Sequence, residues 1–134
     1  LGILTINALS ASNYLLIPVQ TEYYALKAID LLLGIFAKVK ARLNKGITIF
    51  GFLPTMYQAN TLHSREVLAI LHKTYGNQVL AVVIENTVKF PDSAIVETFN
   101  REPTPASILR YDPMSKYADA YRKLAQILIG VPHG

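Results

Sequence analysis

The sequence predicts an α/β fold in which parallel strands alternate with helices. Three short apolar runs lie at Tyr14–Gln20, Ile47–Leu53 and Val79–Ile84, and two longer segments with helical spacing separate them. The runs are nearly continuous in apolar residues, which is typical of strands that are buried on both faces of a sheet. Because strands joined through helices form βαβ units, we expect a parallel sheet of three strands with helices on both faces.

The helices are predicted from the spacing of apolar residues and from the residues that can end them. The first long helix is expected from about Thr21, which can cap it, to Asn44, and Gly46 can then take the left-handed conformation that ends helices. The second is expected over Thr61–Tyr75. A last helix is expected to begin near Pro113, with Asp112 as its N-cap.

The segment from Glu85 to Met114 shows no long periodic pattern. Its prolines stand at positions 91, 103, 105 and 113. Loops of this length are uncommon in compact domains and usually carry function. We therefore treat this segment as a candidate functional region.

Composition excludes several classes of protein. The 134 residues are 51% hydrophobic, which excludes a disordered tail and suffices for one domain with a sizeable core. Without cysteine, the chain can form neither a disulfide nor a thiolate metal site, and a cytosolic location is favoured. No apolar run approaches the roughly 20 residues that cross a bilayer. The formal charge of +4 favours a polyanionic partner if the basic residues cluster.

Ligands of parallel sheets bind beyond the carboxyl ends of the strands, where loops and helix N-termini meet. Gln20–Tyr24, Pro54–Gln58 and Glu85–Ser93 occupy these positions. Each segment mixes hydrogen-bonding side chains with a proline or an aromatic residue, which suits a flat, polar ligand such as a nucleobase. The same residues are also ordinary in turns, so composition alone leaves both interpretations open.

No catalytic or metal-binding motif is present. His63, His72 and His133 stand far from any Ser or Asp pattern of a triad, and no HExxH occurs, so we expect surface histidines. The phosphate-binding signature GxxxxGK followed by Ser or Thr is absent too. We therefore expect neither a catalytic residue nor a metal site within this chain.

Several strings nevertheless resemble a single family. LGILTINALSASNYLLIPVQTEYYALKAIDLLL at Leu1–Leu33 resembles the stretch that follows the Walker B strand in ParA/Soj partition ATPases. The resemblance continues through PTMYQANTLHSREVL at Pro54–Leu68, NTVKFPDS at Asn86–Ser93 and YDPMSKYADAYRKLA at Tyr111–Ala125. Because order and spacing also match, residues 1–134 resemble the C-terminal part of a single ParA-type ATPase domain.

The resemblance implies a partial P-loop NTPase with a Rossmann-like sheet, whose N-terminal half is missing from this chain. Family members bind ATP and Mg²⁺, dimerise around two ATP molecules and then bind DNA nonspecifically. They position a plasmid or chromosome with a centromere-binding, ParB-like partner, and are cytoplasmic and nucleoid-associated. In the family, the P-loop, the catalytic Asp and the Walker B Asp lie upstream of the position that matches Leu1. We therefore expect this chain alone to hydrolyse no ATP and to bind no nucleotide tightly.

The resemblance also assigns binding residues. The adenine base is expected between two loops, whose matching residues are Thr55, Met56, Tyr57, Asn86, Thr87, Val88, Pro91 and Asp92. Many members read IPRNVRL where this chain reads IENTVKF at Ile84–Phe90, so the chain departs from the family in this pocket. For DNA, the basic family positions match Lys89 and Lys116, with Arg110 nearby; lysine can replace arginine where phosphate contacts need only positive charge. Solvated surface lysines are the alternative interpretation.

Two other functions stay open on the sequence alone. One is a catalytically inactive regulatory module that binds protein partners through Tyr23 and Tyr24. The other is a MinD-like ATPase that cycles on membranes through a C-terminal amphipathic helix. The final residues, GVPHG, lack the basic amphipathic extension that such binding needs, so we expect no membrane partner.

Overall fold

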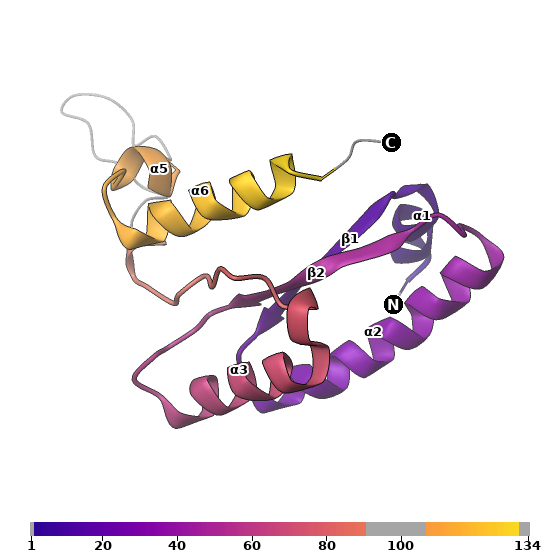
Figure 1. Ribbon diagram of the computed structural model, residues 1–134, viewed down its shortest axis with the longest axis horizontal. Helices are drawn as coiled ribbons and strands as arrows, with labels where there is room; N and C mark the ends of the chain where they lie inside the picture. The colour runs from indigo at the N-terminus through magenta and orange to yellow at the C-terminus, as the bar shows by residue number, and fades with distance from the viewer. Residues whose placement is uncertain (1, 91–106, 132–134) are drawn as a thin grey trace. The chain divides into compact units, whose positions relative to one another are not determined.

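The computed structural model describes residues 2–90 and 107–131, which fall into two compact units. Unit 1 extends to Val83, and unit 2 runs from Ile84 to His133. The described elements of unit 1 are α1 (Ile3–Ala11), β1 (Tyr14–Gln20), α2 (Tyr23–Arg42), β2 (Thr48–Thr55), α3 (Leu62–Tyr75) and a short 3-10 helix, η1 (Gly76–Gln78). Those of unit 2 are α5 (Ile108–Tyr111) and α6 (Lys116–Ile129) (Figure 1).

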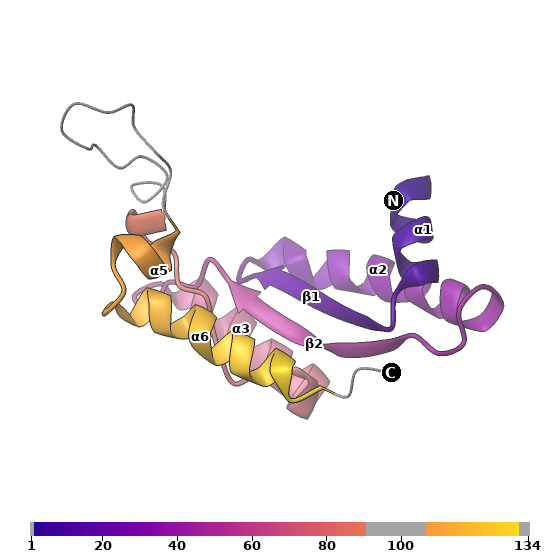
Figure 2. The ribbon, with the colours of Figure 1, turned by 90° about the horizontal axis from the view of Figure 1, so that it is seen from above.

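The strands of unit 1 confirm the predicted α/β class. β1 and β2 pair in parallel, with Tyr14 opposite Thr48 and Gln20 opposite Thr55, and α2 connects them (Figure 2). The register shifts where Leu15 pairs with Ile49 but Leu16 pairs with Gly51. This irregularity adds one residue to β2, which allows Ile49 and Phe52 to face the same core although they are three positions apart.

The predicted third strand, Val79–Ile84, is wrong as an extended strand. Within the described residues it forms a single parallel bridge, between Val79 and Phe52, and the Leu80 N–H donates to the Phe52 carbonyl at 2.9 Å. Val82 and Ile84 are nevertheless buried, so their apolar character reports burial rather than strand pairing. A Cβ at Gly51 would lie 2.7 Å from the Gln78 carbonyl oxygen, so glycine permits this close approach of two backbones.

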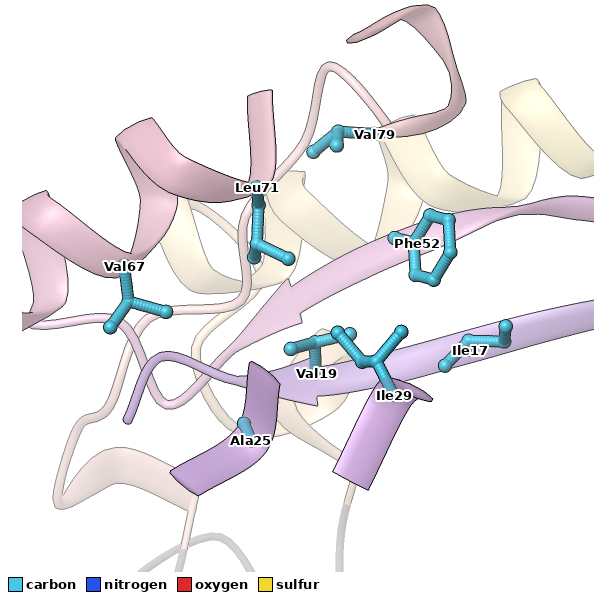
Figure 3. Close-up of a cluster of buried hydrophobic side chains, with 8 residues drawn as sticks. All are labelled: Ile17, Val19, Ala25, Ile29, Phe52, Val67, Leu71 and Val79. Atoms are coloured by element: carbon cyan, nitrogen blue, oxygen red, sulfur yellow. The ribbon is translucent and has the colours of Figure 1, made fainter. Parts of the chain in front are cut away.

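The core of unit 1 lies between the strands and two helices. Its buried side chains are Ile17, Val19, Ala25, Ile29, Phe52, Val67, Leu71 and Val79 (Figure 3). Full burial of one large apolar side chain contributes about 1.5–3 kcal/mol, so this cluster supplies much of the stability of unit 1. On the opposite face of β1, Pro18 and Gln20 are exposed, and unit 1 by itself therefore has helices on one face of this strand.

Two predicted helix ends differ from the structure. α2 ends at Arg42, and Gly46 is not left-handed; Asn44 instead donates its side-chain amide to the carbonyls of Leu9 (3.0 Å) and Ser12 (2.7 Å). α6 begins at Lys116, and its N-cap is Ser115 rather than Asp112, because the Ser115 hydroxyl accepts from the Ala118 N–H at 3.2 Å. α3 ends where its sequence pattern ends, at Tyr75, and Gly76 follows with a φ of 54°, which glycine adopts without strain.

Candidate functional site

A buried pair of hydroxyl groups, Thr21 and Ser64, joins the carboxyl ends of β1 and β2 to the start of α3. Each residue is 1% exposed, and the two hydroxyl oxygens are 3.1 Å apart. The Thr21 N–H donates to the Thr55 carbonyl at 3.1 Å, and the Thr21 hydroxyl lies 3.3 Å from the carbonyl oxygens of both Thr55 and Met56. This network holds the turn after β2 in one conformation.

Sequence reasoning missed this network. It placed Thr21 as the N-cap of α2, whereas the N-cap is Glu22 and has no side-chain capping bond. Ser64 also accepts from the Gln58 N–H at 3.4 Å, which ties the rest of the loop to α3. The position of Thr21 directly after a buried strand was the available signal, but its partner Ser64 lies 43 residues away in the sequence.

The turn after β2 contains the one residue other than glycine that has a positive φ among the described residues. Met56 has a φ of 54°, a left-handed conformation that is uncommon for a residue other than glycine. Its side chain is 49% exposed, while Thr55 and Tyr57 are half-buried. Strained backbone that its surroundings hold in place is frequent in ligand-binding loops, and these are three of the predicted base-binding residues.

The predicted segment Gln20–Tyr24 lies beside this turn. It lines part of an apolar groove of about 360 Å³ between β1 and α2. Tyr24 donates its hydroxyl to the Gln20 side-chain oxygen at 2.9 Å, and Tyr23 donates to Glu66. The hydrogen bond to Glu66 raises the pKa of Tyr23, with smaller contributions from burial and from the charge of that carboxylate.

The predicted surface histidines have different surroundings. The His63 Nε2 lies 3.3 Å from a Glu22 carboxylate oxygen, so this side chain links the starts of α2 and α3. His72 is exposed in the last turn of α3, and His133 lies outside the described residues. Among residues 2–90 and 107–131, no group of three His, Cys, Asp or Glu side chains is arranged to bind a metal ion.

The remaining base-binding candidates belong to unit 2. Asn86 and Val88 are exposed, and Thr87 is half-buried and accepts the Lys89 N–H at 3.3 Å. Pro91 and Asp92 lie outside the described residues. The predicted base-binding residues are thus divided between the two units.

The two lysines predicted to bind DNA are paired with carboxylates inside unit 2. The Lys89 ammonium bonds to Asp112, and the Lys116 ammonium lies 2.7 Å from Glu85 Oε2. These hydrogen bonds raise the pKa of both lysines. Both ammonium groups also lie over the Tyr117 ring, 5.8 Å and 5.3 Å from its centroid respectively.

An aromatic cluster supports this arrangement of charges. Phe90 packs edge-on against Tyr117 and Tyr121, with ring centroids 6.0 Å and 5.9 Å apart. The contacts hold the segment around Lys89 against α6. Arg110, the third DNA candidate, is exposed near the end of α5 and has no ion pair within the described part of the chain.

No described helix combines the length and the apolar composition needed to cross a membrane. This finding does not concern an amphipathic helix, which would lie along the bilayer rather than across it.

Comparison with known sequences gives three informative matches. A family model described as an AAA domain matches residues 1–49. An uncharacterized protein of Mycobacterium tuberculosis is 38% identical over 129 residues, which cover 96% of this chain and 38% of that protein. The chromosome-partitioning ATPase Soj of Thermus thermophilus is 37% identical over 123 residues, or 92% of this chain and 46% of Soj.

A solved structure is similar over the same extent. Cobyrinic acid a,c-diamide synthase from Mycobacterium smegmatis, with bound ADP and magnesium, matches with a TM-score of 0.69 and 30% identity, over 96% of this chain and 42% of that protein. The same enzyme has also been solved with an ATP analogue and magnesium. The chain therefore spans less than half the length of these relatives.

Proposed function

We propose that this chain, which belongs to the ParA/Soj family of ATPases, supplies the adenine-binding loops and a nonspecific DNA-binding surface of an ATPase for plasmid or chromosome partition. The observation that carries this proposal is the 37% identity to Thermus thermophilus Soj over 92% of the chain. Because the chain spans 46% of that relative, we assign ATP hydrolysis, Mg²⁺ binding and the ATP-dependent homodimer to the complete protein.

The turn after β2 supports the nucleotide part of the proposal. A nucleobase site needs an apolar surface for the ring and a few fixed polar groups for its edge. Met56 offers an exposed, polarizable side chain, and the neighbouring Thr55 and Tyr57 offer hydroxyl groups on a backbone that Thr21 holds. Hydroxyl groups beside an apolar side chain are groups that an adenine site could use. The other residues of the proposed set are Asn86, Thr87, Val88, Pro91 and Asp92.

The DNA part of the proposal assigns phosphate contacts to Lys89, Lys116 and Arg110. All three belong to unit 2, and Arg110 is exposed without a carboxylate partner in the described residues. A ParB-like, centromere-binding protein is the proposed partner. The cytoplasm, with association to the nucleoid, is the proposed location.

Substitution of Met56 tests the nucleotide proposal, because stability and binding should change in opposite directions. Met56→Gly removes the side chain that would contact the base, and it relieves a left-handed φ that glycine adopts freely. In the complete protein that contains this sequence, we expect about tenfold weaker binding of ATP, as for the loss of one well-buried apolar contact. The unfolding temperature should stay the same or rise.

Binding of a fluorescent ATP analogue in the presence of Mg²⁺ measures the effect. Met56→Leu is the matched control, because it keeps an apolar side chain and the strained backbone, and it should bind nearly as well as the unaltered protein. Unchanged affinity in Met56→Gly would contradict the assignment of this turn to the base.

A regulatory module without nucleotide binding is the second candidate function. Tyr23 and Tyr24 favour it, because these side chains are 53% and 68% exposed at the start of α2. Absence of ATP binding by the folded, complete protein would favour this candidate over an ATPase.

A further inference from the structure

The side chains that surround the two DNA-candidate lysines are arranged to compete for them. Glu85 lies in the segment before Lys89, and Asp112 follows α5, yet their carboxylates meet Lys116 and Lys89 respectively. Each lysine is thus held by an acid from a different part of unit 2. Both ammonium groups also lie over one aromatic ring, that of Tyr117.

We infer that the carboxylates of Glu85 and Asp112 compete with DNA: they occupy Lys116 and Lys89 in the absence of DNA and give way to DNA phosphates when the protein binds. This inference rests on the proposed DNA-binding function. The exchange replaces one oxygen anion by another at each ammonium group, so no proton or covalent bond is transferred.

The exposure of the two pairs makes this exchange feasible. The side chains of Lys89 and Asp112 are 42% and 30% exposed, and those of Lys116 and Glu85 are 68% and 27% exposed. A solvent-exposed pair of this kind raises the equilibrium constant for folding by a factor of at most about five, and salt weakens it further. A phosphate contact also releases counterions from DNA, which favours the exchange at moderate salt.

Contacts without charge also hold the segment around Lys89. Phe90 already packs against Tyr117 and Tyr121, and these contacts do not involve charge. Both ammonium groups are charged at neutral pH with or without these partners, because the ordinary pKa of lysine lies far above 7, and the hydrogen bonds to Asp112 and Glu85 raise it further. A carboxylate that only held the loop in place would duplicate the contacts of Phe90 with Tyr117 and Tyr121.

The test removes each carboxylate and keeps its lysine. Asp112→Asn and Glu85→Gln are made in the complete protein that contains this sequence, and affinity for a labelled duplex of arbitrary sequence is measured with ATP and Mg²⁺ over a series of salt concentrations. Each substitution should raise the affinity about three- to fivefold at low salt, which corresponds to the strength of one exposed pair.

Asp119→Asn is the matched control. It removes the same charge from the same unit, but its partner is Arg122, at 2.7 Å, which has no proposed contact with DNA. An effect of net charge alone would appear equally in the control. The inference therefore requires a larger gain in Asp112→Asn and Glu85→Gln than in Asp119→Asn.

A double substitution separates the possible outcomes. If Asp112 acts through Lys89, Asp112→Asn should give no more than the control gain in a Lys89→Gln background. If Asp112→Asn and Glu85→Gln raise the affinity for DNA no more than Asp119→Asn does, the inference is overturned. If Lys89→Gln and Lys116→Gln nevertheless bind DNA more weakly, the DNA proposal still stands. Unchanged binding in those two lysine variants would overturn the DNA proposal itself.

Discussion

Unit 1 and unit 2 hold their polar groups in opposite ways. In unit 1, the hydroxyls of Thr21 and Ser64 are buried and fully hydrogen-bonded around the turn after β2. In unit 2, the pairs of Lys89 with Asp112 and Lys116 with Glu85 are partly open to solvent. A buried network is costly to break and fixes one geometry, whereas an exposed ion pair exchanges partners at little cost. The first suits a preformed binding loop, and the second suits a surface that changes partners.

The distribution of charge sharpens this comparison. Residues 1–83 carry seven Lys or Arg and three Asp or Glu, whereas residues 84–133 carry six of each. The formal charge of +4 therefore resides in unit 1, although the DNA-candidate residues belong to unit 2. Net charge gives no support to those candidates, and the proposal for them depends on their match to the family and on their local surroundings.

The largest effect is expected from breaking the buried network. Thr21→Val keeps the shape of the side chain but leaves the hydroxyl of Ser64 without one partner, and the carbonyls of Thr55 and Met56 in the turn lose their contact with the Thr21 hydroxyl. A buried polar group without its partner costs about 1–3 kcal/mol, so unfolding in urea should show a loss of that size.

The matched control is Thr48→Val on the exposed start of β2, which should change stability by less than about 0.5 kcal/mol. Equal stability of the two variants would show that the Thr21 network does not hold the turn.

A smaller effect is expected from the exposed hydrogen bond of Tyr23. Its pKa is raised from 10.0, first by the hydrogen bond to Glu66, so the folded protein keeps a phenol proton that the unfolded chain loses. The stabilisation is therefore complete below pH 10 and disappears as the pH rises through the raised pKa. Glu66→Gln should return the titration of Tyr23 toward its usual range.

Absorbance of tyrosinate during a pH titration measures this effect, and Tyr23→Phe identifies the signal. Tyr75 provides an internal comparison, because burial is the main cause of its raised pKa and Glu66→Gln should leave it unchanged. A Tyr23 titration that does not respond to Glu66→Gln would contradict the assigned hydrogen bond.

The sequence predicted the elements better than the contacts between them. Apolar runs and helical spacing located β1, β2, α2 and α3, since burial and periodicity are local properties. The same logic failed for Val79–Ile84, because burial of these residues requires no paired strand. An apolar run in the sequence cannot distinguish a buried, paired strand from a buried segment that forms no strand.

The candidate site was predictable only where local sequence carries the information. The family strings located the turn at Met56, but they gave no sign of its left-handed backbone. Asp112 and Ser115 are both good capping residues; Ser115 caps α6, and the carboxylate of Asp112 bonds to Lys89, which lies 23 residues earlier. Pairing over such separations is set by the tertiary fold, so the ion pairs of the two lysines with Asp112 and Glu85 could not be predicted.

We propose that DNA contacts belong to the exposed, exchangeable pairs of unit 2 rather than to the charge excess of unit 1. DNA affinity over a series of salt concentrations, with ATP and Mg²⁺, tests it directly by comparing Lys89→Gln/Lys116→Gln with Lys38→Gln/Arg42→Gln. The second variant removes equal charge from exposed positions of α2 in unit 1. We expect Lys89→Gln/Lys116→Gln to reduce the slope of log affinity against log salt concentration by about one for each lysine, without a change in ATP-dependent dimerisation. Lys38→Gln/Arg42→Gln should change this slope little. A larger loss in the unit 1 variant, or no loss in either variant, would show that the lysines of unit 2 do not contact DNA.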